Sequence, residues 1–158
     1  MSSFPPPSAL PQTQPDDSLL ISGPNLRLRV AVLRPGVVLV SARGEVKNAE
    51  DVSAEAALLH ALEVELERAG QLRVFADLRE SERMPSTSRE RYSNWARRRE
   101  AQSLRVHVLV RSSLLEMAMS IVSMLIGTDR VVVHVKPAAF MAALAEAAPL
   151  TELPRAPD

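Results

Sequence analysis

Short apolar segments with strand character alternate with helix-length segments along most of this 158-residue sequence. Residues Leu72–Leu78, for example, form a short, apolar and partly β-branched segment, which is typical of a strand buried in a sheet. Parallel strands need long crossover connections, and helices usually supply them. The alternation therefore predicts an α/β fold in which helices cover a mixed, mostly parallel sheet.

We expect an antiparallel hairpin at the start of the domain. Apolar and polar residues alternate over Leu26–Val32, the turn residues Arg-Pro-Gly follow at 34–36, and Val37–Ala42 supplies a second strand. A helix is expected over Ala49–Ala69, because apolar residues recur every four positions and Gly70 is suited to end it. Its apolar stripe is Ala54, Leu58, Leu62 and Leu66, with the charged residues mostly elsewhere, among them Glu55, Glu63, Glu65, Glu67 and Arg68.

Three more strands and three more helices complete the predicted order β-β-α-β-α-β-α-β-α, with five strands and four helices. The strands are expected at 72–78, 104–110 and 130–135, and the helices at about 87–102, 113–127 and 137–148. Capping-box spacing supports two of the helix starts, at Thr87 with Glu90 and at Ser113 with Glu116. Pro137 suits the first turn of the last helix.

The ends of the chain differ in composition from its middle. Residues 1–24 hold half of the twelve prolines, so we expect a disordered Pro-rich tail that serves as a mobile spacer or as a polyproline II ligand. The structured domain is expected at 25–149, followed by a disordered C-terminal tail at 150–158. The N-terminal residues lack the basic and apolar regions of a signal peptide, so no leader is expected.

Overall composition narrows the classes of function. The formal net charge is zero, so no global field attracts nucleic acid, and the absence of cysteine excludes disulfides, thiolate catalysis and cysteine-based metal sites. The longest apolar-rich stretch, 114–127, is too short to cross a bilayer. Cationic residues are nearly all arginine, which indicates a GC-rich bacterial genome. We expect a soluble, cytoplasmic bacterial protein with no transmembrane segment and no nucleic-acid partner.

The pattern over residues 26–148 resembles the anti-sigma-factor-antagonist (STAS) family and its SpoIIAA-like and SEC14-like relatives. The residues that carry the resemblance are Val74–Arg79 as the central strand, Trp95 on the next helix, Val106–Val110, and the ending Val131–Ala145 with Phe140. The resemblance implies a STAS-like βα sandwich that regulates by binding another protein. Its SEC14-like side implies, as the alternative, a small-ligand or lipid-binding domain with a pocket lined by Phe75, Trp95, Met117 and Ile121.

The resemblance also implies a candidate switch. In anti-sigma antagonists of this family, a serine that follows an aspartate near the start of the helix after the third strand is phosphorylated by a partner kinase. Here the Asp-Ser-Ser-Gly pattern is absent from the corresponding residues 77–88, and the possible phosphoacceptors are Ser86, Thr87 and Ser88. A phosphate there would lie at a helix N-terminus. The competing interpretation is that Thr87 only caps the helix.

Asp77 is expected to end a central strand at the carboxyl edge of the sheet, where open α/β sheets bind ligands. It can accept a ligand hydrogen bond or a proton, or it can simply cap a loop. No second carboxylate, histidine or glycine-rich loop stands at a useful spacing, so an enzyme is not expected.

The three histidines are candidate metal ligands: His60 in the first predicted helix, His107 in the fourth strand and His134 in the fifth. His107 and His134 become neighbours if their strands pair, but two histidines lack a third ligand. We therefore expect packing or surface roles, and neither a metal nor a cofactor.

A basic cluster lies on and after the second predicted helix. It can contact phosphates or an anionic membrane surface. Alternatively, its charges are neutralised by ion pairs on a solvated helix face, which is the favoured interpretation. The cluster comprises Arg89, Arg91, Arg97, Arg98, Arg99 and Arg105.

The helix predicted at 113–127 has more apolar surface than packing on one sheet requires. At 100° per residue, Leu114, Met117, Ala118, Ile121 and Leu125 form one side, and a second apolar side adjoins it. Either neighbouring helices cover this second side, or another chain does, as a homodimer or a regulatory partner. The predicted interaction surface is Leu115, Met119, Val122 and Ile126, together with Tyr92 and Trp95.

Overall fold

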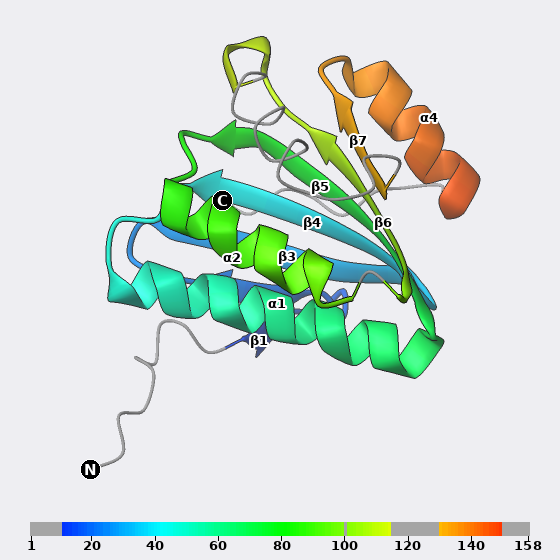
Figure 1. Ribbon diagram of the computed structural model, residues 1–158, viewed down its shortest axis with the longest axis horizontal. Helices are drawn as coiled ribbons and strands as arrows, with labels where there is room; N and C mark the ends of the chain where they lie inside the picture. The colour runs from blue at the N-terminus through cyan, green and yellow to red at the C-terminus, as the bar shows by residue number, and fades with distance from the viewer. Residues whose placement is uncertain (1–10, 100, 115–129, 150–158) are drawn as a thin grey trace.

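The computed structural model describes residues 11–99, 101–114 and 130–149. One seven-stranded sheet runs through the molecule, and its strands lie side by side in sequence order from β1 to β7 (Figure 1). The strands are β1 (Gln12–Thr13), β2 (Leu19–Ser22), β3 (Leu26–Arg34), β4 (Val37–Gly44), β5 (Gln71–Ser81), β6 (Ser103–Leu109) and β7 (Val131–His134). The helices are α1 (Ala49–Ala69), α2 (Ser86–Arg97), the 3-10 turn η2 (Ser112–Leu114) and α4 (Pro137–Ala147).

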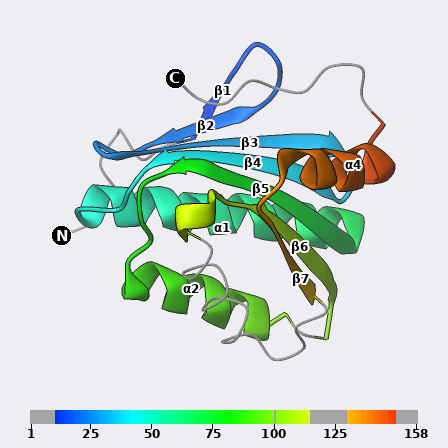
Figure 2. The ribbon, with the colours of Figure 1, turned by 90° about the horizontal axis from the view of Figure 1, so that it is seen from above.

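The sheet is antiparallel from β1 to β4 and parallel from β4 to β7. Gly36 turns β3 into β4 with a φ of 80°, in the left-handed region that glycine enters without steric cost. Right-handed crossovers that step in one direction across a sheet place their helices on the same face. Because α1 and α2 both connect parallel strands, they cover the same face of the sheet. Helix α4 follows the last strand and lies on the other face (Figure 2).

The predicted mixed sheet with a parallel half is confirmed, but the predicted count of five strands is wrong in detail, and one of the four predicted helices lies almost entirely outside the described residues. The sheet has seven strands, and the described residues contain three α-helices. The two additional strands, β1 and β2, lie within the segment expected to be a disordered tail. Leu19 pairs with Val30 and the side chain of Ile21 is fully buried, so this short apolar run joins the sheet despite the prolines around it.

Two of the predicted helices need separate comment. The helix predicted at 87–102 ends earlier, at Arg97. The helix predicted at 113–127 falls almost entirely outside the described residues.

Sequence-local signals account for α1. Asn48 and Asp51 form a reciprocal capping box at its start, and Gly70 ends it in the left-handed conformation with its N–H on the carbonyl of Leu66. The predicted stripe is confirmed: all four of its residues are at most 5 % exposed and pack on one sheet face. These residues are Ala54, Leu58, Leu62 and Leu66.

A second, smaller core forms under α4. Pro137 occupies the first turn of α4, and Phe140 and Leu144 are buried against Phe75 and Leu109 on the opposite face of the sheet from α1. Since alternate residues of a strand point to opposite faces, β5 contributes Phe75 to this core and its neighbour Val74 to the core under α1.

None of the helices in the described part of the chain is long and apolar enough to cross a membrane.

Candidate functional site

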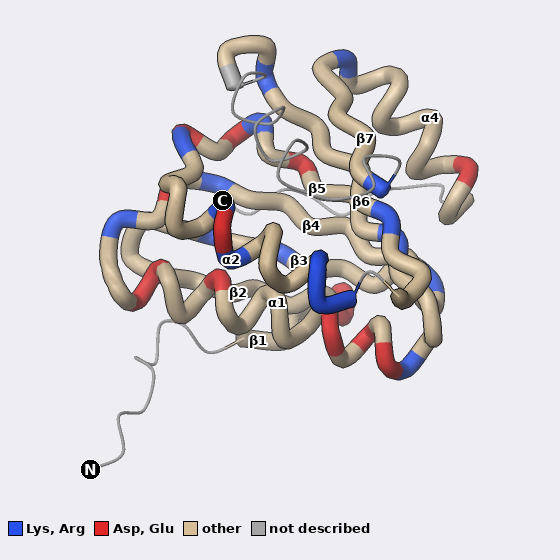
Figure 3. Tube along the Cα trace, in the orientation of Figure 1, with Lys and Arg blue, Asp and Glu red and all other residues tan. Residues whose placement is uncertain are grey.

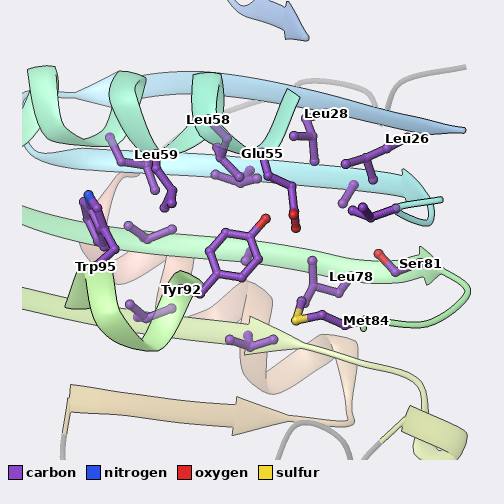
Figure 4. A pocket seen from close by; sticks show the side chains of 18 of the residues that line it. Leu26, Leu28, Glu55, Leu58, Leu59, Leu78, Ser81, Met84, Tyr92 and Trp95 are labelled. Atoms are coloured by element: carbon purple, nitrogen blue, oxygen red, sulfur yellow. The ribbon is translucent and has the colours of Figure 1, made fainter. Parts of the chain in front are cut away.

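An apolar cavity of about 160 Å³ lies between α1, α2 and the adjoining face of the sheet (Figure 4). Its walls come from β3 to β7 and from the facing sides of both helices. The lining residues are mostly aliphatic, with Tyr92 and Trp95 from α2, and include Leu26, Leu28, Leu58, Leu59, Leu78 and Met84. The two helices and the sheet thus border a partly open space that side chains leave unfilled.

One carboxylate enters this apolar region from α1. Glu55 is only 3 % exposed, and its Oε1 accepts a hydrogen bond of 2.9 Å from the hydroxyl of Ser88 and a short charge-assisted bond from Arg91. The Tyr92 hydroxyl lies against the same carboxylate (Figure 4). Burial, followed by the negative charge and hydrogen bond of Glu55, raises the pKa of Tyr92 well above 10.0. Sequence reasoning placed Glu55 outside the buried stripe and so missed this network.

The start of α2 differs from the predicted capping box. The N-cap residue is Pro85, which makes no side-chain hydrogen bond to the helix, so Thr87 does not cap it. Ser86 and Thr87 are exposed, whereas Ser88 is fully buried against Glu55. Of the three candidate phosphoacceptors, only the first two present their hydroxyls at the surface.

The loop before α2 is anchored by ionic and polar contacts at its ends. Arg83 Nε lies 3.4 Å from a carboxylate oxygen of Glu45, and Arg111 Nη2 donates a 2.7 Å bond to the carbonyl of Ser81. These contacts hold the loop beside the carboxyl ends of β4, β5 and β6. The exposed start of α2 is therefore positioned at one edge of the parallel part of the sheet.

Asp77 does not end its strand, because β5 continues to Ser81. Its carboxylate accepts two side-chain hydrogen bonds from Arg79, of 2.9 and 2.7 Å, and one from the backbone N–H of the same residue. This bidentate pairing occupies both carboxylate oxygens. Asp77 therefore forms a local ion pair within the strand, and its predicted role as a ligand-binding residue stays a prediction.

Tyr92 and Trp95, predicted as part of an interaction surface, line the internal cavity instead. Trp95 is 9 % exposed, and the guanidinium of Arg99 lies 4.5 Å above its ring. Phe75, which was expected to share a pocket with Trp95, belongs to the core on the opposite face of the sheet. The other residues of the two surface predictions, Leu115, Met117, Met119, Ile121, Val122 and Ile126, lie outside the described residues.

His107 and His134 are neighbours, as their pairing strands predicted, whereas His60 is exposed on α1. The two rings are stacked, with His107 Nδ1 at 3.0 Å from His134 Nε2, and the ring of His107 also stacks on Phe75. Burial lowers the pKa of both histidines below 6.5, and the charges of His134, Arg105 and Arg73 lower the pKa of His107 further. Within the described residues, no group of three or more potential ligands can hold a metal.

Two arginines of the basic cluster form ion pairs with α1. Arg91 pairs with Glu55, and Arg99 pairs with Glu63 while donating a 2.9 Å bond to the carbonyl of Trp95. Figure 3 shows the basic end of α2 beside acidic residues of α1. Ion pairing between the two helices, the interpretation favoured from the sequence, is confirmed for these two arginines.

The chain was compared with known proteins. No model of a protein family matches it, and no curated protein matches it in sequence. A solved structure does match: the crystal structure of an anti-sigma factor antagonist from Mycobacterium paratuberculosis. The two chains are 14 % identical, the TM-score is 0.52, and the match covers 84 % of this chain and 98 % of the other. The STAS-like fold inferred from the sequence is therefore confirmed, because this protein has the fold of an anti-sigma factor antagonist.

Proposed function

We propose that this protein is a non-enzymatic regulatory module of the STAS type, which acts by binding another protein or a second copy of itself. The observation that carries the proposal is the structural likeness to an anti-sigma factor antagonist over most of both chains. A fold can host many functions, so the residues of the contact surface, and not the fold, determine which partner binds.

The exposed loop before α2 and the first turn of the helix are the proposed contact surface. Glu82, Arg83, Ser86 and Thr87 are all exposed there, at the carboxyl edge of the parallel strands. A rigid scaffold with polar loops at one edge is a common arrangement for recognition. The ion pair of Arg83 with Glu45 gives the loop a defined position before a partner binds.

Ser86 and Thr87 are the proposed switch residues within that surface. A phosphate on either one would lie at the N-terminus of α2, where free backbone N–H groups and the helix dipole favour negative charge. Pro85 contributes no competing side-chain cap. Such a modification would change the charge of the contact surface without disturbing the buried Ser88.

The apolar residues Leu115, Met119, Val122 and Ile126 are a second proposed contact surface, for self-association or for a regulatory partner. That proposal rests on the helical pattern of the sequence alone. It would use flexible methionine side chains, which adapt well to a partner surface.

A capture experiment with matched variants tests the proposed loop surface. Wild-type protein, Ser86→Glu with Thr87→Glu, and the control Ala56→Glu on the exposed side of α1 are immobilised and challenged with soluble extract. Bound proteins are then quantified by mass spectrometry. The proposal expects at least one protein, or the chain itself, to bind wild type and control equally and to lose affinity for the double variant.

If every protein retained by the wild type is retained equally by the double variant, the loop is not the contact surface. If the wild type retains no protein at all and the purified chain is strictly monomeric by light scattering, the interaction module itself is excluded.

A further inference from the structure

We propose that the cavity between α1, α2 and the sheet binds a small, neutral, mostly apolar molecule that carries one hydrogen-bond acceptor. This would be a ligand site in addition to the protein-binding surface at the start of α2. Of the exposed residues of that surface, only Arg83 also lines the cavity. The substitutions that test the two proposals are at different residues, so the two proposals stand or fall separately.

The size and walls of the cavity support this ligand class. Protein interiors are close-packed and leave few voids larger than a water molecule, yet this cavity has a volume of about 160 Å³. An engineered apolar cavity of about 150 Å³ stays dry and binds benzene. The aliphatic walls, which include Leu28 from β3 and Leu58 from α1, therefore suit a molecule the size of one six-membered ring (Figure 4).

Two buried hydrogen-bond donors at the cavity indicate that the ligand carries an acceptor. Trp95 Nε1 and Ser93 Oγ have no hydrogen-bond partner among the described residues. Both residues line the cavity, and they are only 9 % and 1 % exposed, respectively. Burying a donor without an acceptor lowers stability. A carbonyl or ether oxygen of a bound molecule would supply the missing partner.

The charges at the cavity exclude an ionic ligand. The charged side chains among its lining residues are Glu45, Glu55 and Arg83. Glu55 is paired with Arg91, and Glu45 is paired with Arg83 at 3.4 Å. Moving an unpaired ion from water into such an apolar space would cost far more free energy than moving a neutral molecule of the same size.

Cyclohexanone and methylenecyclohexane form a matched pair of probes, because they share ring size and shape and only the ketone has an acceptor oxygen. Binding is followed through the fluorescence of Trp95, the single tryptophan of the chain, and by calorimetry. We expect both probes to bind saturably. Ser93→Ala and Trp95→Phe should weaken the ketone about three- to tenfold relative to the hydrocarbon, as loss of one net hydrogen bond implies.

A second set of variants fills the cavity with larger side chains. Ala76 lines it from β5, so Ala76→Leu should abolish binding of both probes, while Ala56→Leu on the exposed side of α1 should leave binding unchanged. Val106→Leu, at the wall formed by β6, replaces Ala76→Leu if that variant does not fold.

The proposal is overturned if neither probe binds the folded wild type up to its solubility limit. It is also overturned if binding occurs but survives both filling variants. A ketone affinity that is unchanged in Ser93→Ala and Trp95→Phe would overturn the assigned acceptor. None of these outcomes bears on capture of a protein partner, which is measured with variants at 86 and 87.

Discussion

The hydroxyl of Ser88, in the first turn of α2, donates a 2.9 Å hydrogen bond to the carboxylate of Glu55 on α1, and both side chains are buried. This contact links the two helices that cover one face of the sheet. It also separates Ser88 from its neighbours Ser86 and Thr87, which are exposed. A hydroxyl that holds two helices together in the core is unsuited to reversible modification.

Replacing Ser88 by alanine should destabilise the protein by about 1–3 kcal/mol, because a buried acceptor loses one of its donors. Ser86→Ala is the matched control, and it should change stability by less than about 0.5 kcal/mol because the side chain is exposed. Urea denaturation of both variants measures the difference. Equal stabilities would show that the link between the helices contributes nothing.

Removing the Asp51 carboxylate should cost about 3 kcal/mol or more, since hydrogen bonds to a buried charge are among the strongest single contacts. The fully buried carboxylate accepts bonds from the backbone N–H groups of Asn25, Lys47 and Asn48 and from the side chain of Asn25. Burial alone would raise the pKa of Asp51, but these bonds outweigh it and hold the pKa below 3.8.

Thermal and urea unfolding of Asp51→Ala test this prediction, with the exposed Glu67→Ala on the same helix as control. An Asp51→Ala variant as stable as the control would contradict it.

Gly44→Ala should destabilise the protein more than Gly70→Ala. Both glycines have positive φ, of 90° and 77°, so alanine is strained at either position by about 1 kcal/mol. A Cβ at Gly44 would in addition lie 2.0 Å from the carbonyl oxygen of Asn25, whereas a Cβ at Gly70 meets nothing within 4 Å. The difference between the urea midpoints of the two variants measures the destabilisation caused by the steric clash. Equal midpoints would contradict the predicted clash.

Acidification should destabilise the fold through the stacked pair of His107 and His134. Their pKa values lie below 6.5 in the folded protein, so the unfolded chain binds more protons once the pH falls under 6.5. The stabilisation is present above pH 6.5 and is lost as the pH falls through the lowered values. The nearby charges of Arg73 and Arg105 oppose protonation of His107 throughout this range.

Urea midpoints at pH 7.5 and pH 5.5 measure the effect. The difference between them should shrink in His107→Phe and persist in His60→Gln, which changes an exposed histidine on α1. An undiminished difference in His107→Phe would assign the pH dependence to other groups.

Met119→Glu should convert a wild-type oligomer into a folded monomer if the apolar side at Leu115, Met119, Val122 and Ile126 mediates self-association. A buried carboxylate in an apolar interface would be strongly unfavourable. Light scattering coupled to size-exclusion chromatography gives the mass. A wild-type monomer excludes self-association, and an unfolded variant shows that Met119 is needed in the core.

Local signals predicted much of the fold. The capping residues and four-residue periodicity of α1, the turn at Gly36 and the β-branched run of β5 act within a few neighbouring residues, so the sequence shows them directly. The short strand β2 was missed because it is stabilised by pairing with β3, whereas the proline-rich composition of the residues around it predicts disorder.

Composition and periodicity by themselves determined that this chain folds as helices over a mixed sheet, because burying apolar stripes admits few arrangements. The tertiary structure decided what the polar residues do. It buried Glu55 and Ser88 together, paired Glu63 with Arg99, and placed Trp95 on a cavity instead of a surface. Hydrogen bonds and ion pairs join groups far apart in the sequence, and their partners are set only when the helices pack.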